Sequence, residues 1–517
     1  MAQISVNHLT FYYDGCFDNI FEDVSFSIDT SWKLGFIGRN GKGKTTFLNL
    51  LLGKYEYKGS IATTTVFDYF PYQVKKDDCE KSAAELMETW KPGVESWRVL
   101  CELGSLSLDA GLLYRPFSTL SFGERTKLML AVLFSGENDF LLIDEPTNHL
   151  DSKSREIIKA YLASKQGFIL VSHDRDLLDA CIDHVLVLNR KTVEVKAGNF
   201  STWWENKEKA DNFARMENEK HLHQIQKLRD AADRSARWAE KNENSKIGFN
   251  PSKEPDRCID TRAYIGAKTK KMQARVSAYN KRMDREIEQK EGLLKDIEEP
   301  VNLKIMPLVH YKKNLVRVED YSLRYADADN PVFEGLSFEI HQGDLVFLSG
   351  ENGCGKSSVI KMLLEKAGTD MEEHPKMKIE ESGAFEVAAN LVISYINQDT
   401  SFLGGSLKDF ARKKNLDYSL LLSLLRQLDF ERVQFEKNME NFSEGQKKKV
   451  LIAASLLTPA HLYIWDEPLN YIDVFSRMQI ERLIEEFNPT MLLVEHDVRF
   501  KEKLGGRDVP FQNNVPE

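Results

Sequence analysis

The 517-residue chain contains no apolar run that approaches the roughly 18–20 residues needed to span a bilayer. Its longest apolar stretches, residues 128–134 and 450–457, have the length of buried helices. Residues 1–6 lack the basic start and the apolar core of a secretory signal. We therefore expect a cytoplasmic protein with no membrane partner.

Cysteine is scarce, and net positive charge is absent. The six cysteines are scattered without paired spacing, which is typical of a reducing compartment and argues against a zinc site. The net charge of −10 argues against generic nucleic-acid binding, so we expect no DNA partner. Residues 220–282, however, hold 16 Lys and Arg against seven Asp and Glu, a local excess of +9 that leaves −19 elsewhere. This asymmetry indicates a local basic contact surface.

The chain is too long for one core, and its two ends repeat each other. Residues 21–28 (FEDVSFSI) align with residues 333–340 (FEGLSFEI) at an offset of 312. Short β-type runs alternate with helical patterns in both copies, which predicts a mostly parallel sheet covered by helices. We predict domains at residues 1–204 and 300–517, joined by a linker at residues 205–299.

The linker contains two helical periodicities, at residues 205–239 and 268–298, with helix-breaking Gly and Pro between them. The first places these residues largely on one face: Phe213, Met216, Leu222, Ile225, Leu228 and Ala232. An antiparallel helical hairpin is predicted, and a helix of about 32 residues reaches roughly 48 Å. The fold class is thus α/β, with two tandem nucleotide-binding domains joined by a long antiparallel α-helical hairpin linker.

Each copy contains a phosphate loop of the form G-x-x-x-x-G-K-[ST], at residues 38–45 and 350–357. Each loop follows an apolar run and opens onto a helical pattern, which is the context that the motif requires. Loop glycines let backbone N–H groups approach phosphates, and the lysines neutralise the β and γ groups. We assign these residues to ATP: Gly38, Asn40, Gly41, Gly43, Lys44, Thr45, Thr46, Gly350, Asn352, Gly353, Gly355, Lys356, Ser357 and Ser358.

An apolar strand ends in Asp144-Glu145 in the first copy and in Asp466-Glu467 in the second. We expect each aspartate to hold Mg²⁺, together with Thr45 or Ser357, and each glutamate to position or deprotonate the attacking water. In the alternative interpretation, these carboxylates only mark the end of a strand.

A Ser-x-Gly turn opens a basic helix 23 residues before each of these aspartates. With residues 120–125 (LSFGER) and 442–447 (FSEGQK), the chain resembles an ATP-binding cassette protein, and the turns resemble its signature loop. The resemblance implies that Ser121 and Gly123 approach the nucleotide at Lys356, while Ser443 and Gly445 approach that at Lys44. The same serines also fit ordinary helix N-caps, which does not compete.

Further site residues are implied by this resemblance. His173 and His496 each end an apolar strand and match the family's sensor of the γ-phosphate. Tyr13 and Tyr325 align at the position that stacks on adenine, with strand packing as the alternative. Asp151 and Asp473 each lie six residues past the glutamate and match the family's loop between cassettes.

The family also has a glutamine that contacts Mg²⁺ and water. Gln398 is the candidate in the second copy, and Gln73 is the candidate in the first. If the first copy is aligned on Tyr69, however, Tyr72 takes that position.

Two cassettes, no membrane segment and a charged hairpin together resemble the ABC-F class, whose members bind the ribosome at the tRNA exit site. Three details resemble its antibiotic-resistance ribosomal protection branch (Lsa/Vga-like). Only 75 residues separate Thr45 from Ser121, against 85 in the second copy; the linker is long; and residues 468–470 read Pro-Leu-Asn. The resemblance implies a monomer with two intramolecular ATP sites that contacts rRNA and peptidyl-tRNA of the bacterial 70S ribosome.

Three functions remain open: a resistance factor that displaces lincosamides, pleuromutilins or streptogramin A, a housekeeping ABC-F translation factor, and a transporter's ATPase half. If the chain is a resistance factor, basic flanks of the hairpin contact RNA phosphates, and a tip at residues 245–259 reaches toward the peptidyl-transferase centre. Those flanks comprise Lys227, Arg229, Arg234, Arg237, Lys268, Lys270, Lys271 and Arg275, which also fit a solvated helical face. Gly and Pro interrupt the C-terminus after Leu504, so we expect it to be loosely ordered.

Overall fold

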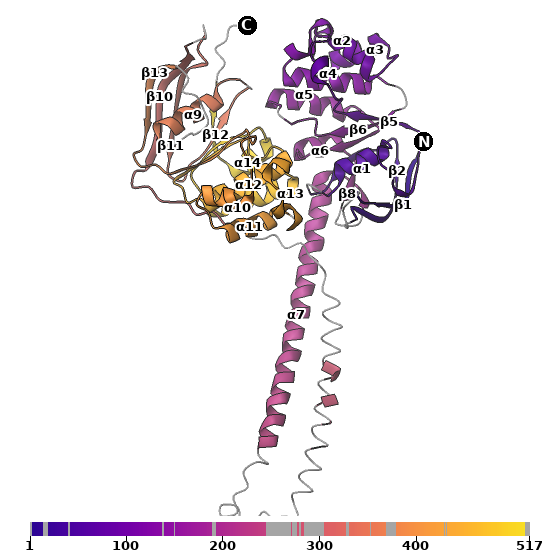
Figure 1. The fold of residues 1–517 in the computed structure, drawn as a ribbon, viewed down its shortest axis with the longest axis vertical. Helices are drawn as coiled ribbons and strands as arrows, with labels where there is room; N and C mark the ends of the chain where they lie inside the picture. The colour runs from indigo at the N-terminus through magenta and orange to yellow at the C-terminus, as the bar shows by residue number, and fades with distance from the viewer. Residues whose placement is uncertain are drawn as a thin grey trace, which may run out of the picture. The chain divides into compact units, whose positions relative to one another are not determined.

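The computed structural model describes residues 3–13, 19–39, 42–136, 139–148, 150–188, 193–244, 270, 274, 277–278, 281–283, 304–326, 330–351, 353–368, 379–428, 430 and 432–511. The chain divides into two compact units, one of residues 1–203 and 300–517 and the other of residues 204–299. The first unit holds both sequence repeats, and the second contains most of a single long helix (Figure 1).

The first repeat contains two sheets. The smaller is antiparallel, in the order β2-β1-β4, with strands Phe21–Asp29, Gln3–Phe11 and Lys58–Ala62. The larger has the order β5-β6-β7-β3-β8-β9, with strands Val66–Phe70, Asp139–Asp144, Phe168–Val171, Lys33–Ile37, His184–Leu188 and Val193–Ala197. All of its pairings are parallel except that of β9 with β8.

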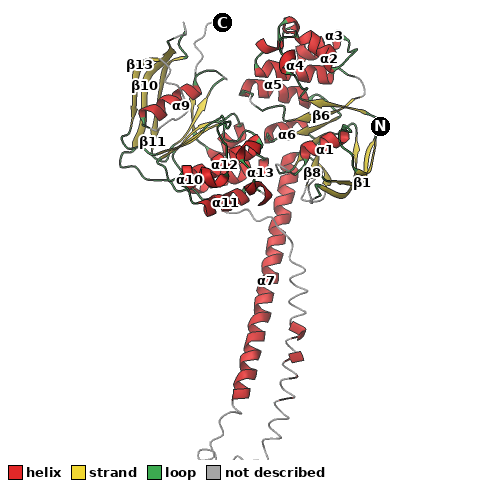
Figure 2. Cartoon of the chain, viewed as in Figure 1, coloured by secondary structure: helices red, strands yellow, loops and turns green. Residues whose placement is uncertain are grey.

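Helices accompany the sheets of the first repeat and are drawn in red against the yellow strands in Figure 2. They are α1 (Lys44–Leu51), α2 (Ala83–Trp90), α3 (Ser96–Ser105), α4 (Phe122–Phe134), α5 (Ser152–Ala163) and α6 (Arg175–Cys181). Every residue of β7 is buried, as expected for a central parallel strand with both faces covered. The catalytic candidates lie at the ends of these buried strands, so the core fixes their position.

The second repeat has the same plan. Its antiparallel sheet has the order β11-β10-β13, with strands Phe333–His341, Asn314–Tyr325 and Ile379–Val387. Its parallel sheet has the order β14-β15-β16-β12-β17, with strands Ile393–Ile396, Leu462–Asp466, Met491–Val494, Leu345–Ser349 and Arg507–Pro510. Its helices are α9 (Lys356–Lys366), α10 (Leu407–Lys413), α11 (Tyr418–Gln427), α12 (Glu444–Leu457), α13 (Val474–Phe487) and α14 (Val498–Leu504). The predicted duplication of an α/β nucleotide-binding fold is confirmed.

The prediction of a loosely ordered C-terminus was wrong for residues 505–511. Residues 507–510 form β17, which pairs in parallel with β12, and Val509 is buried. Gly505 ends α14 with φ +65°, and Gly506 is required where it stands because a Cβ there would lie 2.6 Å from the ring of Phe347. Pro510 is tolerated because β17 is an edge strand. Residues 512–517 lie outside the described part of the chain.

Helix α7 spans Phe200–Asn244, so it is longer at both ends than the predicted 205–239. It begins early because the Asn199 side chain accepts a hydrogen bond from the backbone N–H of Thr202 at 3.0 Å, which caps the first turn. Phe200 and Trp203 are buried, and the Trp203 ring meets that of Phe475 edge to face. Its 45 residues correspond to roughly 68 Å of helix.

The apolar face predicted for this helix is only partly correct. Ile225 is buried, as is Ala214 three turns earlier, but Phe213, Met216 and Leu222 are more than half exposed. Residues 214 and 225 lie 11 positions apart, or three turns, so they share one side that Phe213 and Met216 do not. The side chains of Leu228 and Ala232, and nearly all of the predicted helix 268–298, lie outside the described residues.

None of the helices in the described ranges is both long enough and apolar enough to cross a membrane.

A buried ion pair joins the two repeats. Glu481 of α13, which is fully buried, accepts hydrogen bonds from both terminal nitrogens of Arg175, at the start of α6. Lys503 of α14 also donates to Glu481, at 3.0 Å.

We expect Glu481→Ala to lower the thermal midpoint of unfolding markedly, because it leaves Arg175 buried without its carboxylate, a cost of about 3–5 kcal/mol. The double variant Arg175→Met/Glu481→Leu should recover most of the loss, since it removes both charges and keeps apolar volume. Equal midpoints for the single and double variants, measured by differential scanning calorimetry, would show that the pair does not matter for stability.

Candidate functional site

Each phosphate-loop lysine is buried and turned back onto its own loop. Lys44 Nζ donates to the carbonyl oxygen of Gly38 at 2.6 Å, and Lys356 Nζ to that of Gly350 at 2.9 Å. Burial lowers the pKa of Lys44. The predicted Asn40, Gly41 and Asn352 lie outside the described residues.

The loop glycines that precede the two helices are required by their geometry. Gly43 and Gly355 both have φ +99°, in the left-handed region that favours glycine. A Cβ would also lie 2.5 Å from Ile20 at Gly43 and 2.7 Å from Phe333 at Gly355. Each glycine therefore lets a helix begin close against a strand, with backbone N–H groups exposed at its N-terminus.

The predicted magnesium residues lie together in both repeats. Thr45 Oγ1 donates to Asp144 Oδ2 at 3.1 Å, and Ser357 Oγ donates to Asp466 Oδ2 at 3.3 Å. Burial raises the pKa of Asp144, and it raises that of Asp466 to about 6 with a further contribution from Glu467. A hydroxyl and a buried carboxylate are the few oxygen ligands that Mg²⁺ takes from protein when phosphates and water supply the others. The residues fit that ion.

The glutamate and histidine predicted to act on the attacking water also face each other. Glu145 Oε1 lies 3.3 Å from His173 Nε2, and Glu467 Oε1 lies 3.9 Å from His496 Nε2. Burial raises the pKa of Glu145 to about 8 and lowers that of His496 to about 3. His496 is therefore neutral at pH 7 and can donate one hydrogen bond and accept another.

Two of these atoms are buried without a hydrogen-bond partner. Neither Glu145 Oε1 nor His496 Nε2 has one among the residues that the structure describes. An unsatisfied buried polar atom costs free energy, so each is suited to bind a ligand group or a water that arrives with the nucleotide.

The glutamine prediction needs a correction in the first repeat. In β5, Tyr69 pairs with Leu142, two residues before Asp144; in β14, Tyr395 pairs with Ile464, two residues before Asp466. Tyr72 therefore occupies the position of Gln398, and Gln73 lies one residue further on and is exposed. The aromatic-x-x-Gln spacing favoured Gln73. The register of the strands instead places Tyr72 at the position of Gln398.

The two repeats consequently differ around their carboxylates. Gln398 Nε2 donates to Glu467 Oε2 at 2.8 Å. In the first repeat, Tyr72 donates to Asp68, while the hydroxyl of Tyr69 donates to Asp144 Oδ2 at 3.1 Å. Sequence reasoning did not identify Tyr69 as a site residue, since a tyrosine inside a strand usually indicates packing.

The signature serines are N-caps of α4 and α12. Ser121 Oγ accepts from the N–H of Glu124 and Ser443 Oγ from that of Gln446, each at 3.3 Å within a capping box. Gly123 and Gly445 lie in the first turns of these helices. The approach of Ser443 to the nucleotide at Lys44, and of Ser121 to that at Lys356, stays a prediction.

The loop aspartates do act across the repeats. The negative charge of Asp473 opposes the lowering of the pKa of Lys44 and of His173 in the first repeat, and Asp151 does the same for His496 in the second. Although burial works against its ionisation, the ion pair with Lys449 at 2.8 Å holds the pKa of Asp473 well below its usual value. The charge of Asp473 thus reaches Lys44 and His173 of the first repeat, and that of Asp151 reaches His496 of the second.

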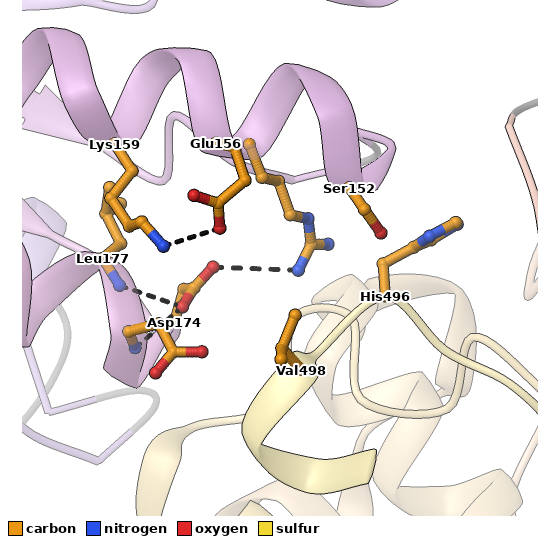
Figure 3. A pocket seen from close by; sticks show the side chains of 9 residues that line it. Ser152, Glu156, Lys159, Asp174, Leu177, His496 and Val498 are labelled. Atoms are coloured by element: carbon orange, nitrogen blue, oxygen red, sulfur yellow. Dashed lines mark hydrogen bonds and ion pairs between the residues drawn. The ribbon is translucent and has the colours of Figure 1, made fainter. Parts of the chain in front are cut away.

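A pocket lies beside His496, between α5, α6 and the segment that leads into α14 (Figure 3). Asp174 is fixed on one wall, where its carboxylate accepts from the N–H of Leu177 and lies 3.8 Å from Arg155. The lining residues are Ser152, Arg155, Glu156, Lys159, Asp174, Asp176, Leu177, His496 and Val498.

The helix that follows His496 is tied to α6 and to the start of α7. Arg499 forms ion pairs with Asp176 and, at 2.6 Å, with Asp179. Asp179 also accepts from the backbone N–H of Ser201 at 2.7 Å, and Arg499 donates to the Ser201 hydroxyl at 3.3 Å. We call Asp176, Asp179, Ser201 and Arg499 the root cluster. No pattern in the sequence indicates this cluster, because its members are far apart in the chain.

The predicted adenine-binding tyrosines occupy equivalent positions. Tyr13 hydrogen-bonds to the Thr46 hydroxyl at 2.8 Å, and Tyr325 to the Ser358 hydroxyl at 2.7 Å. Each ring is thereby held beside the first turn of the helix after the phosphate loop, and each is partly accessible.

We expect the double variant Tyr13→Ala/Tyr325→Ala to bind ATP about tenfold or more weakly, because stacking on a base contributes about 1–3 kcal/mol. The matched variant Tyr13→Phe/Tyr325→Phe keeps both rings and should retain most of the affinity in equilibrium titrations. If the alanine variant binds ATP as the intact chain does, the tyrosines serve only strand packing.

Comparison with known proteins agrees with this geometry. A family described as "ABC transporter" matches residues 21–148 and 333–470, slightly more than half of the chain. "Ribosome protection protein VmlR" of Bacillus subtilis (strain 168) is 27% identical over 503 residues, covering 96% of this chain and 84% of its own length. "ATP-binding protein Uup" of Buchnera aphidicola is 26% identical over 547 residues, covering 99% and 81%.

Among solved structures, the complex of the archaeal ribosomal stalk protein aP1 with the ribosome recycling factor aABCE1 matches with a TM-score of 0.59 at 19% identity. The match covers 98% of this chain and 88% of the other, and at this identity it shows the fold alone. The family match confirms the predicted ATP hydrolase and the fold of two cassettes. The chain belongs to the ABC transporter family, as an ATPase of the ABC-F type with two ATP-binding cassettes.

Proposed function

We propose that this ATPase binds the bacterial 70S ribosome at the tRNA exit site and uses the linker at residues 205–299 to displace antibiotics from the peptidyl-transferase centre. The observation that carries the proposal is α7, a 45-residue helix that starts in the ATPase unit and continues into the insert. A helix of roughly 68 Å is long enough to act far from the nucleotide sites.

Charge on the helix supports an RNA partner. Lys227, Arg229, Arg234 and Arg237 of α7 are all exposed, as is Lys270. Exposed basic side chains on an otherwise acidic chain suit contact with RNA phosphates, and such contact weakens as salt rises. Lys268, Lys271, Arg275 and the tip at residues 245–259 lie outside the described residues.

The similarity to a protein named for ribosome protection supports the resistance branch. The similarity to Uup, which is almost as high and covers slightly more of this chain, favours a second candidate, a housekeeping ABC-F translation factor. Both functions need the same ATPase and ribosome contact. They differ only in whether a bound drug is displaced.

The root cluster offers a route from nucleotide to hairpin. His496 faces Glu467 at the second site, and Arg499 follows three residues later on α14. Arg499 and Ser201 meet at Asp179, and Ser201 lies in the first turn of α7. A displacement of His496 on nucleotide binding is thus passed through two short polar contacts to the base of the helix.

We expect Glu145→Gln/Glu467→Gln to bind ATP, lose hydrolysis and accumulate on ribosomes, because hydrolysis can no longer reopen the closed cassettes. Co-sedimentation with ATP, compared with ADP, measures this. Single variants Glu145→Gln and Glu467→Gln should each keep turnover at the other site. Co-sedimentation at background level with ATP would remove both ribosomal candidates, and continued hydrolysis by the double variant would refute the assigned glutamates.

Deletion of residues 240–262 tests whether drug protection needs the tip while ATP hydrolysis does not. We expect ribosome-independent ATP hydrolysis to remain, since the nucleotide sites lie in the other unit. Translation in the presence of a lincosamide, a pleuromutilin or streptogramin A should no longer be protected by the shortened chain. Protection that persists would refute the role of the tip, and an intact chain that never protects would favour the housekeeping factor.

A further inference from the structure

The two repeats differ at two buried positions next to the catalytic candidates. Two residues after the glutamate, the first repeat has Thr147 and the second has Leu469. Immediately before the histidine, the first has Ser172 and the second has Glu495. All four residues are buried. The leucine of the Pro-Leu-Asn sequence, Leu469, therefore differs from the first repeat together with a second buried residue, Glu495.

Glu495 bridges the two segments that carry Glu467 and His496. One carboxylate oxygen accepts a hydrogen bond from the backbone N–H of Leu469 at 2.8 Å, and the other accepts from that of His496 at 3.1 Å. In the first repeat, the Ser172 hydroxyl instead accepts from the N–H of Asp174 at 3.1 Å. No hydrogen bond among the described residues joins Ser172 to Thr147. Among the residues that the structure describes, this bridge is found in the second repeat alone.

The bridge extends to Glu467, the residue expected to position the attacking water. Leu469 is followed by Asn470, whose side-chain amide donates to Glu467 Oε2 at 2.6 Å. The backbone of Glu467 is held with φ +46°, a left-handed conformation that a non-glycine residue adopts only when its surroundings fix it. A clip on Leu469 thus restrains both the Asn470 side chain and the backbone that orients Glu467.

A buried carboxylate is costly unless it is well hydrogen-bonded, and here each oxygen has a donor. The charged and titratable groups around it are Arg477 of α13, Lys448 of α12, Glu467 after β15, and His496 and Asp497 before α14. Burial raises the pKa of Glu495 to about 7. A leucine in place of threonine at residue 469 leaves the backbone N–H as the polar group that faces this carboxylate.

We propose that Glu495 is a positioning residue for ATP hydrolysis at the second site, where it fixes Glu467 and His496 relative to each other. It touches neither nucleotide nor water and acts through Leu469, Asn470 and the backbone of His496. The inference rests on the assigned roles of Glu467 and His496, which the double glutamine variant tests separately.

The test uses Glu145→Gln as background, so that turnover comes from the second site. Adding Glu495→Gln keeps the shape of the side chain but turns an N–H₂ group toward one of the two N–H donors. We expect kcat to fall about tenfold with the KM for ATP and the thermal midpoint nearly unchanged. Leu469→Thr/Glu495→Ser, which recreates the pair of the first repeat, should recover a large part of kcat compared with Glu495→Ser alone.

The matched control is Glu381→Gln, which alters a carboxylate on β13 that accepts from Tyr321 and pairs with Lys366, at the opposite end of α9 from Lys356. It should leave kcat at the background value. A wild-type kcat for Glu495→Gln would overturn the proposal. So would a loss of kcat accompanied by a lower thermal midpoint and no recovery in the Leu469→Thr/Glu495→Ser variant, since that pattern indicates a structural role alone.

Discussion

The carboxylate of Asp179 joins the first turn of α7 to α14, the helix that follows His496. It accepts a backbone hydrogen bond from Ser201 in the first turn of α7 and pairs with Arg499 on the helix after His496. Its side chain is 11% exposed, so solvent screens these contacts only weakly. A rigid helix magnifies a small rotation at its base into a large displacement at its far end.

Duplication supplied two similar frames, and substitution has made their chemistry different. Tyr69 donates to the carboxylate of Asp144 in the first repeat, whereas Gln398 donates to Glu467 in the second. Arg175 enters a buried ion pair with Glu481, while the equivalent residue of the second repeat is Val498, which lines the pocket beside His496. Such differences give each site its own hydrogen-bond network around equivalent catalytic candidates.

Local sequence predicted the parts that local sequence determines. The phosphate loops, the Asp-Glu pairs and the capping serines depend on turns and strand ends that a few consecutive residues define, and all described members lie where expected. The hydrogen bond from Tyr69 to Asp144 and the position of Tyr72 depend on strand register, which the spacing of aromatic residues did not reveal. The C-terminal strand forms because pairing with β12 and burial of Val509 outweigh the Gly and Pro signals. The root cluster and the Arg175–Glu481 pair join residues hundreds of positions apart, beyond any pattern in one sequence.

We propose that nucleotide state reaches α7 through Asp179. The most direct measurement is the ratio of ribosome dissociation constants with ADP and with ATP, in a chain that carries Glu145→Gln/Glu467→Gln. Adding Asp179→Asn, which keeps an acceptor for Ser201 but removes the charge that holds Arg499, should reduce this ratio severalfold while ATP affinity stays unchanged. Asp23→Asn, at an exposed carboxylate on β2, should leave the ratio as it was. An unchanged ratio in the Asp179→Asn chain would contradict the account.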